Sequence, residues 1–109
     1  MSIRFTNLAV AAAVLSIAGL AAAADTIKIG VDGPFTGGSS SMGVSMRDGV
    51  RLAVSEINAA GGVLGRKLEV VERDDQAEKG RGVQIAQEFI NKEKVVAAVG
   101  YINTGVALA

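Results

Sequence analysis

Residues 38–45, with the sequence GSSSMGVS, have the glycine spacing of a phosphate-binding loop. The lysine that contacts nucleotide phosphates in such loops is replaced here by Val44, so the main point charge for a nucleotide is missing. The dinucleotide pattern G-x-G-x-x-G is also absent. Two uses remain open, a polar loop that contacts a small anion such as a carboxylate, or a surface loop without a ligand. Ser41 and Met42 are its candidate contacts, and Met42 could equally fill a gap between side chains.

A second group of candidate residues follows the last predicted strand. Thr104 carries a hydroxyl at the expected start of a helix, and Asn103 stands directly before it. Their side-chain oxygens could cap that helix. Alternatively, the hydroxyl and the free N–H groups of the first turn could hold a substrate carboxylate. Tyr101, at the strand end, could pack in the core or form a pocket wall.

The adjacent carboxylates Asp74 and Asp75 could form a general acid and base, or a metal pair. The sequence contains no His and no Cys, which excludes thiol chemistry, disulfides, zinc sites built from these residues and His base catalysis. Helix capping and solvation are therefore the expected roles of the two aspartates. We expect no enzyme activity, no metal site and no cofactor.

The overall composition is that of a globular α/β protein. Of 109 residues, 50% are hydrophobic and 20% are charged, and the formal net charge is zero. A near-neutral chain offers no electrostatic basis for binding nucleic acid or an anionic membrane surface.

The first 24 residues have the pattern of a secretory signal peptide. Arg4 provides the positive charge, an apolar stretch follows over residues 8–20, and the small residues 22–24 predict cleavage before Asp25. A transmembrane anchor is the alternative, but even the longer segment 8–24 is at the lower length limit for a span and no basic cluster follows it. We therefore expect export, most simply to a bacterial periplasm.

The rest of the chain, residues 25–109, alternates between strand and helix patterns. This order predicts a parallel, doubly wound α/β sheet, with a ligand site beyond the carboxyl ends of the strands where the strand order reverses. The apolar strand at 95–99 is expected to be buried on both faces. The predicted strands are 27–31, 68–71 and 95–99, and the strand-end loops hold residues 33–43, 74–75 and 101–104. The predicted helices are 45–60, a second one with a start weakened by Gly80 and Gly82 and an apolar stripe over 83–90, and a third that begins at 105–109.

Three segments together resemble the N-terminal part of a periplasmic leucine/isoleucine/valine-type substrate-binding protein of an ABC transporter. They are IKIGV at 27–31 leading to the glycines at 37, 38 and 43, INAAGGVLGRKL at 57–68, and VERDD at 71–75 leading to VGYINT at 99–104. The resemblance covers residues 26–109, and its middle segment is the most specific.

This resemblance implies a binding site as well as a fold. Members have two α/β lobes joined by a hinge, which close on a small ligand that is often a branched-chain amino acid. A hydroxyl and backbone N–H groups in the first lobe hold the ligand carboxylate, which by this pattern assigns Thr104, with Asn103 and Gly105 beside it, to the carboxylate. An aromatic residue often forms part of the side-chain pocket, and Met42 stands there in this sequence. The acid that pairs with the ligand ammonium belongs to the second lobe.

By the same resemblance, the 109 residues form part of the first lobe of a protein that is a monomer when complete and delivers its ligand to an ABC permease at the inner membrane. The fragment alone is expected to bind ligand weakly and to be poorly stable. Two alternatives remain, a ligand-binding sensor domain of a receptor or regulator with the same fold, and an exported enzyme of doubly wound fold.

Overall fold

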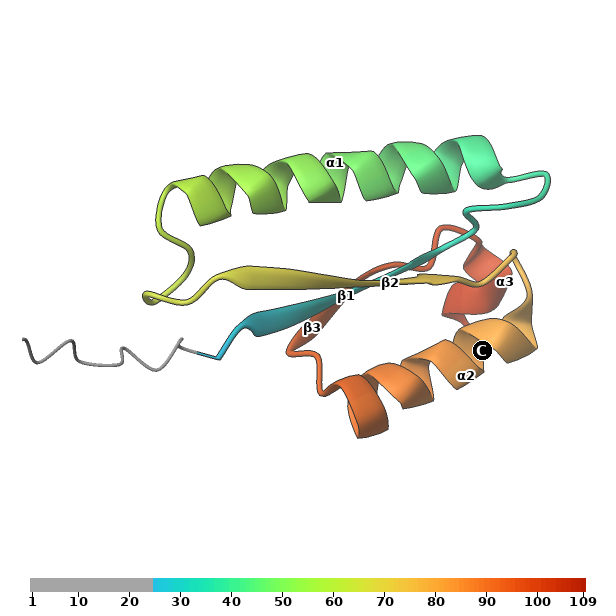
Figure 1. The fold of residues 1–109 in the computed structure, drawn as a ribbon. Helices are drawn as coiled ribbons and strands as arrows, with labels where there is room; N and C mark the ends of the chain where they lie inside the picture. The colour runs from blue at the N-terminus through green and yellow to red at the C-terminus, as the bar shows by residue number, and fades with distance from the viewer. Residues whose placement is uncertain (1–24) are drawn as a thin grey trace, which may run out of the picture.

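The computed structural model describes residues 25–109, so the predicted signal peptide lies outside the described part. Within these described residues, three strands and three α-helices alternate (Figure 1). The elements are β1 (Ile27–Gly33), α1 (Ser40–Ala59), β2 (Leu68–Asp74), α2 (Lys79–Glu88), the π-helical turn η1 (Phe89–Glu93), β3 (Ala97–Gly100) and α3 (Thr104–Ala107).

The three strands form one parallel sheet in the order β2-β1-β3. The central strand, β1, pairs with β2 on one side and with β3 on the other, so the strand order reverses at β1. Figure 1 shows α1 above the sheet and α2 below it, with the two helices on opposite faces. The predicted parallel, doubly wound α/β architecture is therefore confirmed.

Helix α1 begins earlier than the sequence predicted. The pattern of apolar residues indicated a start at Ser45, whereas the helix runs from Ser40 to Ala59. The glycine- and serine-rich stretch is consequently mostly helical, and Ser41 and Met42 lie in the first turn of α1 rather than in a loop. The apolar pattern missed this turn because its side chains are small or exposed and contribute nothing to a buried stripe.

The far end of α1 is attached to the start of β2 through Asn58. Its side-chain Nδ2 donates to the carbonyl oxygen of Leu68 at 2.9 Å, and its Oδ1 accepts from the Leu68 N–H at 2.7 Å. The amide thereby satisfies both backbone groups of Leu68 that face the helix, and it sets the position where the second strand begins.

A small core lies between the sheet and α2. Phe89 is 1% exposed and clusters with Val71 and Ile85. Its ring packs directly on Gly30 of β1, where an added Cβ would lie 2.6 Å from the ring. A second close approach joins α2 to α3, because a Cβ on Gly82 would lie 2.3 Å from Cγ1 of Val106. Both glycines therefore permit contacts that any larger residue would prevent.

Strand β3 differs from its predicted burial. The run 95–99 was expected to be covered on both faces, but β3 covers Ala97–Gly100 and every one of its residues is exposed. The strand is one of the two outer strands of the sheet in the described chain, and Val96 just before it is 70% exposed. Two open hollows of about 340 Å³ and 230 Å³ lie beside it, with linings that are mainly apolar residues of α2, η1, β3 and α3. The sequence pattern was right about apolar character and wrong about the burial of residues 96–99, whereas Val95 is partly buried against the core cluster.

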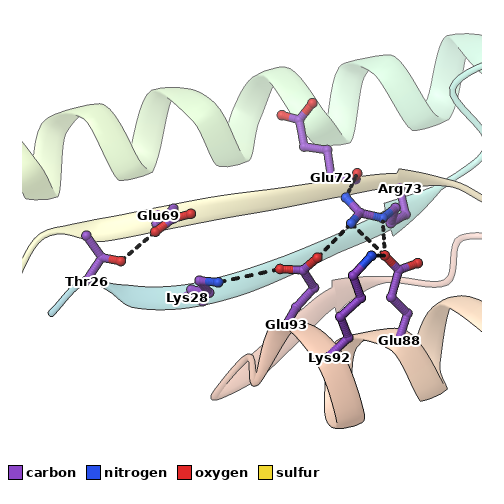
Figure 2. A network of polar contacts seen from close by, with 8 residues as sticks. All are labelled: Thr26, Lys28, Glu69, Glu72, Arg73, Glu88, Lys92 and Glu93. Atoms are coloured by element: carbon purple, nitrogen blue, oxygen red, sulfur yellow. Dashed lines mark hydrogen bonds and ion pairs between the residues drawn. The ribbon is translucent and has the colours of Figure 1, made fainter.

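An ion-pair network connects the sheet to α2 and η1 (Figure 2). Arg73 of β2 donates from Nη2 to Glu88 at 2.7 Å and to Glu93 at 3.0 Å, and Lys28 of β1 approaches Glu93 at 3.5 Å. The hydrogen bond to Glu88, with its charge and that of Glu93, raises the pKa of Arg73, and the hydrogen bond from Arg73 lowers the pKa of Glu88. These pairs connect β1 and β2 to α2 and η1.

Candidate functional site

The carboxyl ends of the three strands lie at one edge of the sheet, because the strands are parallel. Three connecting segments meet at this edge: residues 34–39 after β1, 75–78 after β2 and 101–103 after β3. The short helix α3 also begins there, near the start of α2 (Figure 1). We call this edge the rim.

Asp74 fastens the first connecting segment to the second. Its Oδ1 accepts from the backbone N–H groups of Phe35 at 2.9 Å and Gln76 at 3.0 Å, and its Oδ2 accepts from the Thr36 hydroxyl at 2.6 Å. Burial acts to raise the pKa of Asp74, but the hydrogen bonds from Thr36 and the backbone outweigh it, and the pKa is lowered. This carboxylate is therefore a charged structural link rather than a helix cap.

Asp75 contradicts the prediction that the aspartate pair is solvated. Its side chain is 0% exposed, Oδ1 accepts from the Ala77 N–H at 2.7 Å, and Oδ2 has no hydrogen-bond partner. Its own N–H donates to the carbonyl oxygen of Gly33 at 3.0 Å, which continues the β1–β2 pairing by one residue. The backbone pairing places Asp75 in the interior. Two adjacent acidic residues in a sequence do not indicate such burial.

Asp32, at the end of β1, is also 0% exposed, and neither of its carboxylate oxygens has a hydrogen-bond partner. Burial, and then the nearby negative charge of Asp75, raise the pKa of Asp32 to about 7. Sequence analysis did not single out this residue. A charged residue flanked by Val31 and a glycine at the end of a central strand is the signal that could have found it.

Asn103 brings the third segment to the first. It is the residue before α3, but its side chain makes no capping hydrogen bond. Instead, its Nδ2 donates to the Ser39 hydroxyl at 3.5 Å, and its Oδ1 is buried without a partner. The structure thus does not bear out the capping role for Asn103. It joins the two segments on either side of the point where the strand order reverses.

Thr104 and Gly105 are exposed at the start of α3, and Ser41 and Met42 are exposed at the start of α1. Met42 is 54% exposed. The Asn103–Ser39 contact lies between these two helix starts, so all four predicted contact residues are at the rim. The structure records no contact that places them around one ligand, and their role stays a prediction.

Lys79 at the start of α2 lies close to Gly105. A Cβ added to that glycine would be 3.1 Å from the lysine Cε and 4.0 Å from its Nζ. The rim therefore includes an ammonium group close to Gly105, the residue that follows the exposed Thr104. Sequence analysis missed this lysine because 25 positions of sequence separate it from Thr104 and no motif connects them.

Tyr101 adopts a left-handed backbone conformation, with φ of 57°. Its N–H donates to the carbonyl oxygen of Asp32 at 3.1 Å, and its side chain lines both hollows beside α2. Burial, with the charges of Asp32 and Asp75, raises the pKa of Tyr101. Thr104, Ser41 and Met42 are not among the residues that line these hollows, so the role of Tyr101 as a wall of the ligand pocket stays a prediction.

Within residues 25–109, no helix is both long and apolar enough to cross a membrane. The same part of the chain contains no group of three or more His, Cys, Asp or Glu side chains arranged to hold a metal ion.

Comparison with known proteins adds a family to this geometry. The sequence profile described as periplasmic binding protein matches residues 26–109. The chain belongs to the periplasmic binding protein family. This is a family of solute-binding proteins rather than enzymes.

Individual relatives of this periplasmic binding protein bind different ligands. An "Amino acid binding protein" of Pseudomonas aeruginosa is 41% identical over 93 residues, which are 84% of this chain and 25% of that protein. The branched-chain amino acid transporter substrate binding protein LivJ of Streptococcus pneumoniae, solved with isoleucine, is 36% identical with a TM-score of 0.74, over 76% of this chain and 24% of that one. A solute binding protein of an ABC transporter from Rhodopseudomonas palustris, solved with 3,4-dihydroxy benzoic acid, is 34% identical with a TM-score of 0.69. The match covers 76% of this chain and 22% of that one. The chain therefore spans about a quarter of the length of these relatives.

Proposed function

We propose that this chain is part of the solute-binding component of an ABC importer and that the component binds a branched-chain or related amino acid in the periplasm. The observation that carries the proposal is the rim: Thr104 is exposed there, and Lys79 lies beside Gly105, the next residue, at the point where the strand order reverses. Open α/β sheets bind their ligands at this point.

The rim offers groups that suit a carboxylate. A hydroxyl donor and an ammonium close to one another recognise a carboxylate by a hydrogen bond and by charge. Asn103 and Gly105 are the neighbours through which the backbone of this segment approaches the ligand. Met42 and Ser41, across the Asn103–Ser39 contact, are the proposed neighbours on the first-segment side.

The relatives support a carboxylate ligand more strongly than a particular side chain. Isoleucine and 3,4-dihydroxy benzoic acid, found in two of the related structures, share a carboxyl group and differ in the rest. We propose that Thr104 contacts the shared carboxyl group and that residues such as Met42 contact the rest of the ligand.

The proposal includes the setting of the protein. The chain is part of the first lobe, the complete protein is an exported, non-catalytic monomer in the periplasm, and an ABC permease of the inner membrane receives the ligand. The family and the ABC-transporter relatives support this setting.

The test is calorimetric titration of the full-length gene product with isoleucine, leucine, valine and 3,4-dihydroxybenzoate. Micromolar or tighter binding of an amino acid is expected, and binding of the aromatic acid alone would change the ligand class. Absence of binding by every carboxylate would contradict the proposal. A receptor sensor domain is the second candidate, and ligand-dependent signalling without uptake of the ligand would favour it.

A further inference from the structure

Two buried aspartate side chains at the rim have carboxylate oxygens without hydrogen-bond partners. Among residues 25–109, Asp32 and Asp75 are the charged residues that are fully buried. Both oxygens of Asp32 and the Oδ2 of Asp75 have no hydrogen-bond partner. Ionised carboxylates in such a position are costly unless a cation or a proton compensates them.

The groups around Asp32 indicate that a proton, rather than a cation, neutralises its charge. The titratable groups that act on Asp32 are Asp75 and Asp74 from the end of β2. The charges of Asp32 and Asp75 also raise the pKa of Tyr101, which follows β3. None of these is a cation. Arg73, the register partner of Asp32 on β2, is engaged by Glu88 and Glu93 in the network of Figure 2.

We propose that Asp32 takes up a proton from solvent at neutral pH and donates it in a hydrogen bond to Oδ2 of Asp75, and that this acid–carboxylate pair positions the rim. A proton on Asp32 supplies a donor between two side chains that, when ionised, only accept hydrogen bonds. It also leaves one negative charge in the buried site instead of two. The raised pKa of Asp32 agrees with this assignment.

The pair is placed to control the segment that carries Thr104. The backbone carbonyl of Asp32 accepts the Tyr101 N–H at 3.1 Å, and the Asp75 N–H donates to Gly33 at 3.0 Å. The ends of all three strands are thus tied to these two acids through the backbone. A second negative charge in this buried site would drive the strand ends apart and shift the residues that follow Tyr101. Only the consequence for ligand binding rests on the proposed function.

The test follows the carboxyl carbons of the aspartates by NMR in the ligand-free protein between pH 4 and pH 9. The Asp32 resonance is expected to titrate near neutral pH rather than near the usual aspartate value of about 3.9. The backbone amides of Tyr101 and Thr104 are expected to shift with the same midpoint, since they follow the state of the pair.

Three variants sharpen the test. Asp75→Asn removes the neighbouring charge and is expected to move the Asp32 midpoint toward the usual range. Asp32→Asn places a neutral donor at the same position and is expected to retain the fold and abolish the neutral-pH shift of the Tyr101 and Thr104 amides. Glu56→Gln, on the exposed side of α1, removes a charge far from the pair and is expected to change neither midpoint.

An Asp32 midpoint in the usual aspartate range would overturn the proposal. An Asp32 midpoint unchanged in Asp75→Asn would overturn the assignment of Asp75 as partner. If Asp75→Asn does not fold, the amide titrations in Asp32→Asn and in the unaltered protein decide the matter. Because no ligand is present, failure of the proposed amino acid binding would leave this result intact, and the reverse also holds.

Discussion

The side-chain amide of Asn103 reaches the hydroxyl of Ser39, 64 residues earlier in the chain, at 3.5 Å. The contact joins the segment after β3 to the segment after β1, at the two strand ends between which a doubly wound sheet opens its binding crevice. A hydrogen bond of this length is near the geometric limit, so it aligns the two segments more than it holds them.

Replacement of Asn103 by Ala should therefore have a small effect on stability. The expected loss in free energy of unfolding is about 0.5–1.5 kcal/mol, the usual range for one hydrogen bond. Urea denaturation of Asn103→Ala, Ser39→Ala and the double variant gives the coupling between the two residues. A double variant whose loss equals the sum of the single losses would show that the contact contributes nothing.

Thr104→Val removes the rim hydroxyl and keeps the size of the side chain. If Thr104 contacts the ligand carboxylate, affinity should fall by about tenfold or more, since a hydrogen bond to a charged group contributes about 1.5–3 kcal/mol. Calorimetry of the full-length gene product measures this. The control is Ser55→Ala, which removes an exposed hydroxyl from α1 instead of α3. This variant should bind the ligand as the unaltered protein does.

Lys79→Met tests whether the ammonium beside Gly105 contributes charge to the rim. Affinity for a carboxylate ligand should fall by about two- to fivefold at low salt, because an exposed charge contributes up to about 1 kcal/mol. The difference from the unaltered protein should shrink as salt is added. Equal affinities of Lys79→Met and the unaltered protein at low salt would show that Lys79 does not contribute to ligand binding.

Two glycines of α2 offer a matched pair. Gly82→Ala places a methyl group against Val106 and should destabilise the protein by about 1–3 kcal/mol through overpacking. Gly80 has open space around its Cα, and Gly80→Ala should stabilise by up to about 1 kcal/mol through helix propensity. Thermal unfolding of both variants checks the signs, and destabilisation by Gly80→Ala would contradict the described packing of α2.

The raised pKa of Asp32 predicts a pH dependence of stability. Between the unfolded value near 4 and the folded value of about 7, the folded protein binds one more proton than the unfolded chain. The contribution of Asp32 is therefore complete below about pH 4 and is lost as the pH rises to about 7. Urea denaturation at several pH values should show this decline in the unaltered protein relative to Asp32→Asn, and parallel curves would refute it.

Much of the architecture could be predicted from the sequence, because strand and helix patterns alternate cleanly and the starts of β1 and β2 were placed at Ile27 and Leu68. The parallel, doubly wound order follows from that alternation. The start of α1 was missed because small residues at its first turn carry no apolar signal.

The candidate site was predicted in part. Thr104 is exposed at the rim as expected, but the burial of Asp32 and Asp75 and the nearness of Lys79 to Gly105 arise from contacts between segments distant in sequence. Single-sequence patterns carry information on which residues alternate or repeat, and they carry none on which strand ends become neighbours. The exposure of β3 was missed for the same reason, since strand order decides which strand lies outside.

The exposed outer edge of β3 has a consequence for how the polypeptide is made. A strand edge with free N–H and C=O groups, flanked by the exposed side chains of Val96 and Ile90, is a template on which other extended chains can add. While that edge is uncovered during folding of the newly synthesised chain, it is a site at which chains can aggregate.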